Sequence, residues 1–457
     1  MKNLERWLLP AFLLLQAAGY TQSPVSLNDA VERAQKNFPT VQVSLAQVDA
    51  AAASIRFART SFLPRFDSLA QVNRATRNNI YGMLLQQSVI SPISGPPVIE
   101  NTSASVFGSA VGLLVDWEPF DFGLRHSRVE SAESSRRRAD MSVARTQFEA
   151  GTAAADSYLT VLAGQETVKA ARASVKRSEV LLKAVEALAQ AQLRPGADAT
   201  MARAELAAAQ AQVIRSEQVV AEGKALLAGL IGEQTGRVAV TEGKLLDLPG
   251  EMPIPEVQLA QNPLAREQNA SVEEAKARAR TLDHLWVPRF SLQATSYARG
   301  TGVRPDSTML GGANGLAPTF YNWGLGFTVK FPILDFAPAR AQQAEESARI
   351  RAEEGRYRLV LTQLDIKRNQ ALAAVEAARK LAELAPVQLE AARAAETQAQ
   401  ARYRAGLAAL VEVADAQRVL AQAEIDNGLA RLNVWRALLA LRAAEGDLAP
   451  FLQMAGR

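Results

Sequence analysis

Residues 321–331 read YNWGLGFTVKF, and large apolar side chains alternate with small or polar ones along the whole stretch. Successive side chains of an extended strand point to opposite faces, so this segment would have one apolar, aromatic face. That face would consist of Tyr321, Trp323, Leu325, Phe327, Val329 and Phe331. Half of a soluble sandwich would show the same alternation, so the segment alone leaves open whether the face meets protein or lipid.

The composition fits a large exported protein with little net charge. The chain has 457 residues, 48% of them hydrophobic, with Lys+Arg 51 against Asp+Glu 47 and no cysteine. Residues 1–22 have the basic start, short apolar run and small residues of a secretory signal peptide, for which the alternative is a buried N-terminal helix. Without cysteine there are no disulfides or thiolate metal sites, and the near-neutral balance gives no indication of a nucleic-acid partner.

The sequence contains an internal duplication. The echoes are FLPRF at 62–66 with WVPRF at 286–290, LVDWEPFDFG at 114–123 with TVKFPILDFA at 328–337, and AQLRPGADATMARAE at 191–205 with ARYRAGLAALVEVAD at 401–415. The second echo aligns Asp121 with Asp335, a shift of 214 residues, whereas the third gives a shift of 210. Three echoes in one order predict a repeated structural unit.

Each repeat is predicted to hold two strands followed by a long Ala-rich helical hairpin. The expected organisation is a signal peptide at 1–22, a first repeat at 23–232 with strands at about 65–74 and 106–117 and a hairpin tip at about 194–198, a linker at 233–255, a second repeat at 256–448 with strands at about 288–298 and 321–331 and a tip at about 404–408, and a C-terminal tail at 449–457.

The helices are too long to cover so small a sheet. The Pro-free stretch between Pro338 and Pro386 would reach about 70 Å as a straight helix. Two series of apolar or small residues step by three and four, as in a coiled-coil seam, so we expect the helices to pack on one another. The series are Val413, Ala416, Leu420, Ala423, Asn427, Ala430, Val434, Ala437, Leu441 and Ala444, and Ala199, Ala202, Leu206, Ala209, Val213, Ser216, Val220, Gly223, Leu227 and Leu230.

The apolar strand face is then left for lipid. Unpaired backbone groups are costly in a bilayer, so membrane-embedded strands must close into a barrel, and about eight strands is the smallest barrel known. Four strands per chain therefore predict a barrel shared between chains, and the geometry permits two, three or four copies. Tyr321 and Trp323 near one strand end suit an aromatic girdle at the membrane surface.

These features resemble the TolC-like outer-membrane efflux protein family, the outer-membrane factors. The resemblance rests on SLNDAVERAQKNFPTVQVSLAQVDAAAASIRFARTSFLPRF from Ser26, on WEPFDFG and FPILDFA, and on the hairpin tips RPGAD and RAGLA, and it extends to about Leu448. It implies a mixed, mostly α fold: a homotrimer with a twelve-stranded transmembrane β-barrel, continued by a periplasmic α-helical coiled-coil tunnel. Ala337 departs from the Gly that is usual after Asp335, and no Cys follows the signal peptide.

The resemblance also implies a function and its partners. The chain would be the outer-membrane channel-tunnel of a tripartite efflux or type I secretion system, a passive duct that docks a periplasmic adaptor (membrane-fusion protein) and an inner-membrane pump. The adaptor would meet the hairpin tips, which are Arg194, Pro195, Gly196, Ala197, Arg404, Ala405, Gly406 and Leu407. Gly196 and Gly406 are expected at equivalent turns, where glycine permits a positive φ.

A gate at the periplasmic entrance is the second implied site. The resemblance assigns carboxylates of Glu412 and Asp415 to a ring around the opening, with Tyr403 as a hydrogen-bonding partner. The first-repeat positions taken as aligned with the two acids, Met201 and Ala202, carry no acid, and Ala408 stands where the family can have a basic residue. The local alternative is that acids in a first helical turn gain about 0.3–1 kcal/mol from the helix dipole without any channel role.

No catalytic or cofactor-binding constellation is apparent. His126 and His284 are the only histidines, and no nucleophile has a base at a recognisable spacing. We therefore expect no enzyme activity, no cofactor and no metal site. The alternative to the channel is a periplasmic coiled-coil scaffold or adaptor without a membrane barrel, which leaves the alternating aromatic strands unexplained.

Overall fold

The computed structural model describes residues 23–76, 103–250, 258–304, 306, 308–332 and 336–456. The predicted signal peptide at 1–22, the end of the predicted linker at 251–255 and Asp335 lie outside these residues. The chain forms two compact units. The helical unit comprises the described parts of Met1–Ser44, Val143–Pro263 and Leu361–Arg457, and the sheet unit comprises Leu45–Ser142 and Leu264–Val360.

The elements follow one another in an order that repeats. The first set is β1 (Ser23–Val25), α1 (Leu27–Asn37), α2 (Pro39–Thr60), β2 (Arg65–Thr76), β3 (Ser105–Phe120), α3 (Leu124–Gln190) and α4 (Gly196–Ile231), and after β4 (Val238–Val240) come α5 (Pro263–Leu282), β5 (Arg289–Thr301), β6 (Phe320–Lys330), α6 (Phe336–Arg404), α7 (Leu410–Glu445) and α8 (Ala449–Ala455). The order helix, two strands, two long helices thus occurs twice, as the sequence echoes predict.

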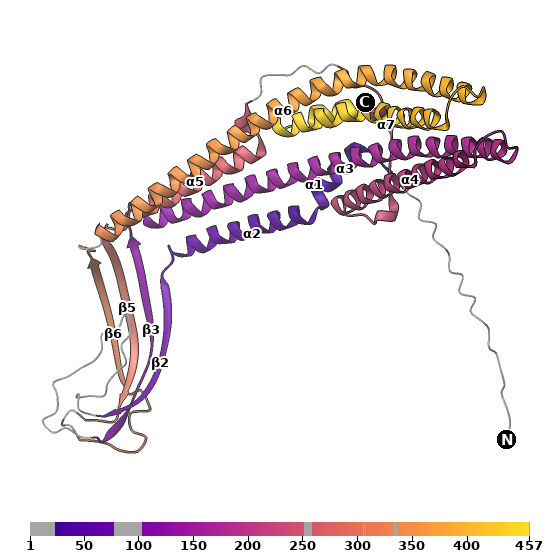
Figure 1. Ribbon diagram of the computed structural model, residues 1–457. Coiled ribbons are helices and arrows are strands. Elements are labelled where there is room, and N and C mark those ends of the chain that lie inside the picture. Colours follow the sequence, from indigo (N-terminus) through magenta and orange to yellow (C-terminus); the bar gives the residue numbers. More distant parts are fainter. Residues whose placement is uncertain are drawn as a thin grey trace, which may run out of the picture. The chain divides into compact units, whose positions relative to one another are not determined.

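The sheet unit is built on four antiparallel strands in the order β2-β3-β5-β6 (Figure 1). These strands correspond to the segments expected at 65–74, 106–117, 288–298 and 321–331. The two repeats meet where β3 pairs with β5, and the register is continuous except for an irregularity between Trp117 and Phe120. Each repeat therefore contributes one strand pair to a single open sheet.

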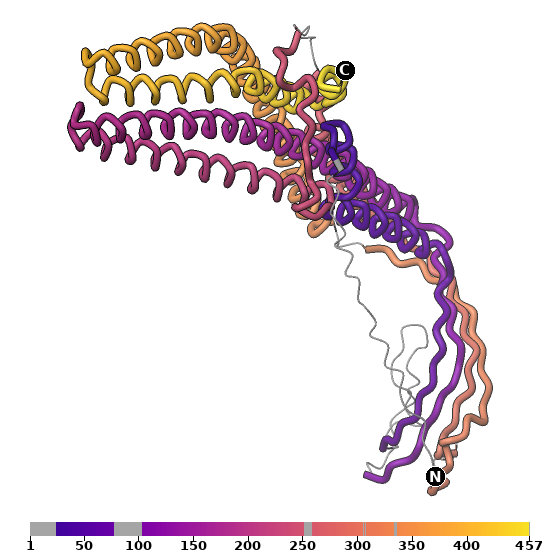
Figure 2. The backbone as a smooth tube through the Cα atoms, turned by 90° about the vertical axis from the view of Figure 1, so that its right-hand side faces the viewer, coloured from indigo at the N-terminus to yellow at the C-terminus, as the bar shows by residue number. Residues whose placement is uncertain are grey.

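The helical unit contains two long hairpins, α3 with α4 and α6 with α7, except for the first parts of α3 and α6, which belong to the sheet unit. The hairpins lie side by side with their tips at the same end (Figure 2). Members of both predicted seams are buried, among them Ala199, Leu227, Val413 and Val434. α6 alone has 69 residues, about 100 Å as a straight helix, and it continues through Pro386. Among the described residues, no helix combines the length and the apolar character needed to cross a membrane.

The main core lies at the ends of the hairpins remote from the tips. Tyr158 of α3 is 1% exposed, and its hydroxyl donates to the backbone oxygen of Thr241 (2.7 Å). The predicted C-terminal tail is partly a helix, α8, whose Phe451 is fully buried with its ring edge-on to Trp435. The predicted linker supplies β4, which pairs in parallel with β1. Both segments therefore belong to this core.

The helix boundaries of the hairpins correct the alignment of the two repeats that was taken from the tip sequences. α3 ends at Gln190 and α6 at Arg404, and α4 and α7 begin at Gly196 and Leu410, so the shift is 214 residues and not 210. The seams and the Asp121 echo already carry the 214-residue shift. The similarity of RPG to RAG suggested a register that is four residues out of step with the helices.

Candidate functional site

The five residues of β6 that are predicted to face lipid lie on one exposed face of the sheet, and Phe331 follows directly after the strand. Tyr321 and Trp323 are 85% and 82% exposed, and Leu325, at the middle of β6, is 70% exposed. Directly opposite residues of paired strands share a face, so the register extends this apolar surface across the sheet. Further exposed members are Phe66 of β2 and Val111, Leu113 and Trp117 of β3, and the remaining predicted residues Phe327, Val329 and Phe331 are exposed as well.

The opposite face of the sheet is mainly polar. Its polar residues are Asp67, Gln71 and Asn73 of β2, Asp116 of β3, Arg289, Ser291, Gln293, Thr295 and Arg299 of β5, and Asn322, Thr328 and Lys330 of β6. A four-stranded sheet with one large exposed apolar face needs a covering partner, either lipid or protein. β2 and β6 are its edge strands, and an exposed edge presents N–H and C=O groups that pair readily with another strand.

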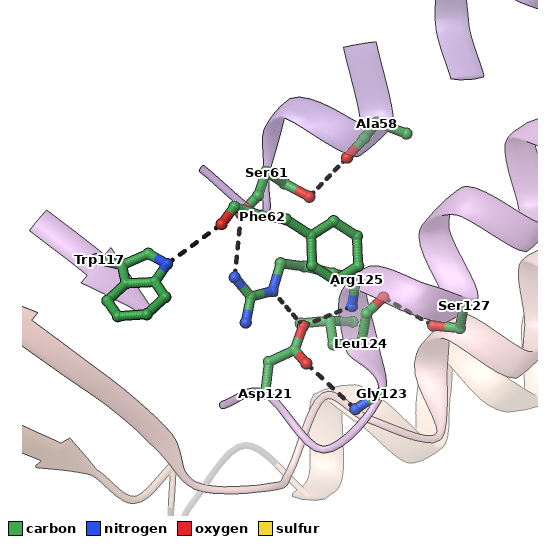
Figure 3. A network of polar contacts seen from close by, with 9 residues as sticks. All are labelled: Ala58, Ser61, Phe62, Trp117, Asp121, Gly123, Leu124, Arg125 and Ser127. Atoms are coloured by element: carbon green, nitrogen blue, oxygen red, sulfur yellow. Dashed lines mark hydrogen bonds and ion pairs between the residues drawn. The ribbon is translucent and has the colours of Figure 1, made fainter. Parts of the chain in front are cut away.

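A buried ion pair fixes the junction between β3 and α3 (Figure 3). Asp121 accepts hydrogen bonds from the backbone N–H of Gly123 (3.2 Å), from the backbone N–H of Arg125 (2.6 Å) and from Nε of Arg125 (2.8 Å). Burial by itself raises the pKa of Asp121, but these hydrogen bonds and the guanidinium charge outweigh it and hold that pKa below its ordinary value. The carboxylate therefore satisfies the first backbone donors of α3.

The same arginine ties α3 to the end of α2. Nη1 of Arg125 donates to the backbone oxygen of Ser61 (3.2 Å), and the guanidinium lies 5.0 Å from the ring centre of Phe62. The indole N–H of Trp117 in β3 donates to the backbone oxygen of Phe62 (3.2 Å), so strand and helices meet at one point (Figure 3). His284, one of the two histidines, packs beside Gly123.

The hairpin tips turn at residues that the 214-residue shift makes equivalent. Gly406 has φ 77° and Gln192 has φ 57°, and each follows a helix end. Gly196 instead begins α4 after Pro195, so the expectation of a positive φ at Gly196 was wrong. The next residues, Leu193 and Leu407, are 70% and 72% exposed. Sequence reasoning missed Leu193, which the correct register would have found.

Tyr403 connects the two hairpins near their tips. Its hydroxyl donates to Oδ2 of Asp198 (3.1 Å), and its backbone oxygen accepts from Nη2 of Arg194 (2.7 Å), whose guanidinium lies 4.6 Å from the tyrosine ring centre. Tyr403 is 3% exposed, and burial together with Asp198 raises the pKa of the tyrosine. The described partner of Tyr403 is thus Asp198. With the 214-residue shift, Asp198 stands opposite Glu412 and Met201 stands opposite Asp415, so the assignment of Ala202 to one of these positions was wrong and that of Met201 was right.

The two predicted gate acids are exposed and carry arginine partners from their own hairpin. Glu412 pairs with Arg402 (3.3 Å) and accepts from the backbone N–H of Ala409 (3.4 Å), which is a helix-capping contact. Asp415 pairs with Arg418 (3.0 Å), which also reaches across to Glu205 of α4. Arg194 of the first repeat occupies the position equivalent to Ala408.

Comparison with known proteins agrees with this architecture. The model of the family described as outer membrane efflux protein matches residues 30–233 and again 254–447, so each match covers one repeat. The chain belongs to this family, which confirms the predicted family resemblance and the outer-membrane location.

Individual relatives match over nearly the whole chain. The pyoverdine export outer membrane protein OpmQ of Pseudomonas aeruginosa is 25% identical over 458 residues, which cover 93% of this chain and 92% of the relative. The cobalt-zinc-cadmium resistance protein CzcC of Cupriavidus metallidurans is 25% identical over 75% of this chain and 78% of its own length. The CmeC outer membrane channel of Campylobacter jejuni superposes with a TM-score of 0.71 at 15% identity, over 92% of this chain and 85% of that one. The mostly α fold with a small sheet is therefore that of solved outer-membrane channels.

Proposed function

We propose that this chain is one of three protomers of an outer-membrane export channel. The observation that carries the proposal is the four-stranded sheet with one exposed apolar face and two edges that no described strand pairs. Every backbone N–H and C=O needs a partner in a bilayer, so such a sheet is stable there only within a closed barrel. Three copies would supply twelve strands, which lies within the range of known barrels.

The polar sheet face would line the barrel, and the helical hairpins would continue it as a periplasmic tunnel. The channel acts passively, as a duct and not as an enzyme, and the energy for export comes from an inner-membrane pump that a periplasmic adaptor connects to it. The proposal is limited to export as such. The two curated relatives are named for different cargoes, pyoverdine in one and cobalt, zinc and cadmium in the other.

The experiment that tests the channel is purification from the outer membrane followed by conductance in planar bilayers. We expect an oligomer that dissociates only on boiling in detergent, with a mass of three chains, and discrete single-channel currents. Recovery of a soluble periplasmic protein without conductance would instead identify a coiled-coil scaffold.

Leu193 and Leu407 support docking of the adaptor at the tips. Both are large apolar side chains that protrude from equivalent turns, and an apolar groove between helices of a partner would bury them. We expect the double change of Leu193 and Leu407 to Glu to abolish export while the trimer remains in the membrane. Replacement of both by Met, which conserves volume and apolar character, should retain export. Full export by the Glu variant would exclude docking through these side chains.

The gate is proposed to involve both hairpins. The hydrogen bond between Tyr403 and Asp198 and the contacts of Arg194 hold the two tips together. Glu412 and Asp415 would add carboxylates to the entrance of the assembled tunnel, where their charge is partly balanced by Arg402 and Arg418. Opening would require the tips to separate, so loss of the tyrosine hydroxyl should favour the open state.

A further inference from the structure

A cavity of about 340 Å³ lies within the helical unit, between α3, α4 and α7. It is about 45 Å along α3 from the hairpin tip, so it is separate from the proposed gate. Its lining comprises Thr160, Ala163, Gly164, Thr167, Gln212, Arg215, Ser216, Val219, Leu429 and Arg436. A volume of this size is at the lower end of those that hold small organic ligands.

Two arginines give this cavity a positive charge without a lining acid. Nη2 of Arg436 donates to Oγ1 of Thr160 (2.7 Å), but its Nε is buried and has no hydrogen-bond acceptor among the described residues. Arg215 donates to the neutral side chain of Gln212, from Nε (3.3 Å) and Nη2 (3.1 Å). Arg436 is half-buried and Arg215 is exposed at the rim, so the burial cost applies to Arg436, whose Nε would gain an acceptor from a bound anion. Together the two side chains offer two cationic groups to a negatively charged ligand.

The rest of the wall limits the kind of anion that fits. Val219 and Leu429 supply an apolar surface beside the arginines. The hydroxyl of Thr167 donates its proton to the backbone oxygen of Ala163 (2.9 Å), so it does not donate a hydrogen bond to a ligand. Arginine favours planar carboxylates, which it can bind with two parallel hydrogen bonds. We propose that this cavity binds a small organic anion, with its carboxylate at Arg215 and Arg436 and its hydrocarbon part against Val219 and Leu429.

The proposal can be tested on the purified full-length protein in detergent with benzoate as the probe. Benzamide has nearly the same shape without the charge, and inorganic phosphate has charge without the apolar part. Isothermal titration should give a dissociation constant for benzoate at least tenfold lower than for either control compound. Equal binding of benzoate and benzamide, or no binding of benzoate at millimolar concentration, would overturn the proposal.

Substitutions assign the binding to this cavity. We expect Arg436→Gln and Arg215→Gln each to weaken benzoate binding at least tenfold, while Arg436→Lys, which keeps the charge, loses less. Lys183→Gln removes the same charge from an exposed position of α3 and should leave the affinity unchanged. Thr160→Val provides a second variant if Arg436→Gln does not fold, because it removes only the hydroxyl that orients the guanidinium.

An unchanged affinity in both arginine variants would place the anion elsewhere and refute the assignment. The measurement requires no conducting channel, so its failure would leave the proposed export function untouched, and loss of conductance would say nothing about the cavity.

Discussion

The lipid-facing assignment of the sheet is tested most directly by a charge at Leu325. This side chain is at the middle of β6, is 70% exposed, and stands opposite Ala294, which in turn stands opposite Val115. In the proposed barrel it would therefore lie near the middle of the hydrocarbon layer on its outer surface. Leu325→Lys would place an ammonium group in lipid, with no described acidic residue on the same face beside it.

The free-energy cost of a lysine at position 325 depends on how deep this position lies in the bilayer. A lysine on the lipid face of a barrel costs about 2–4 kcal/mol at the bilayer midplane and much less near the interfaces. This range corresponds to roughly a 30-fold to 1,000-fold loss in the folding equilibrium of one protomer, since every 1.4 kcal/mol is about tenfold. Each trimer would carry the change three times, so the effect on assembly should exceed that on a single strand.

The assay is the yield of oligomer that resists dissociation without boiling, measured after refolding into phospholipid vesicles. We expect Leu325→Lys to lose most of that oligomer. Thr328→Lys is the matched control, because Thr328 lies on the polar face opposite Ser291 and would project into water. If both variants lost the oligomer equally, the apolar face would not be the one in contact with lipid.

Three further outcomes are expected. Tyr403→Phe removes the hydrogen bond from the tyrosine hydroxyl to Asp198, and such a bond contributes about 1 kcal/mol. The open state in planar bilayers should therefore become roughly fivefold more populated. An unchanged closed time would contradict the role of this hydrogen bond. Trivalent cations at micromolar concentration should block conductance from the periplasmic side, and block it far less when Glu412 and Asp415 are both replaced by Ala; equal block would leave these acids as helix caps only. Because the pKa of Asp121 is lowered in the folded state, the stability it contributes is present above its unfolded pKa and is lost as pH falls through the folded pKa. Asp121→Asn should therefore lower the unfolding temperature at neutral pH and flatten its dependence on pH below about 5, and an identical acid profile in the two proteins would refute this.

The strands could be predicted because their two faces meet different surroundings. The alternation in residues 321–331 corresponds in the structure to one exposed apolar face and one polar face of the sheet. The same pattern is present in β3 of the first repeat. The helices were predictable as elements, since their seams keep steps of three and four. Both signals are local, and each repeats along the chain often enough to be read without an alignment.

The tips were misaligned for a physical reason. Gly406 turns the second hairpin, but Gln192 takes the same left-handed conformation in the first, so aligning glycine with glycine gave the wrong register. Because of this wrong register, Asp198 was not identified as the counterpart of Glu412. Its contact with Tyr403 joins hairpins that are far apart in sequence, and no short-range pattern encodes such a contact. The same holds for Arg215 and Arg436, which come together only when α4 and α7 pack.

The arginine that fixes the joint between strand and helix in the first repeat has no counterpart in the second. Where Arg125 clamps α3 to Asp121 and to the end of α2, the equivalent residue before the body of α6 is Ala339, a buried methyl group that can form no ion pair. In the first repeat a twist of α3 would therefore act on an ion pair and on the contacts of Arg125 with Ser61 and Phe62, whereas the equivalent position of α6 offers only a methyl group. In an assembly of three chains, joints that hold this arginine would alternate around the ring with joints that lack it.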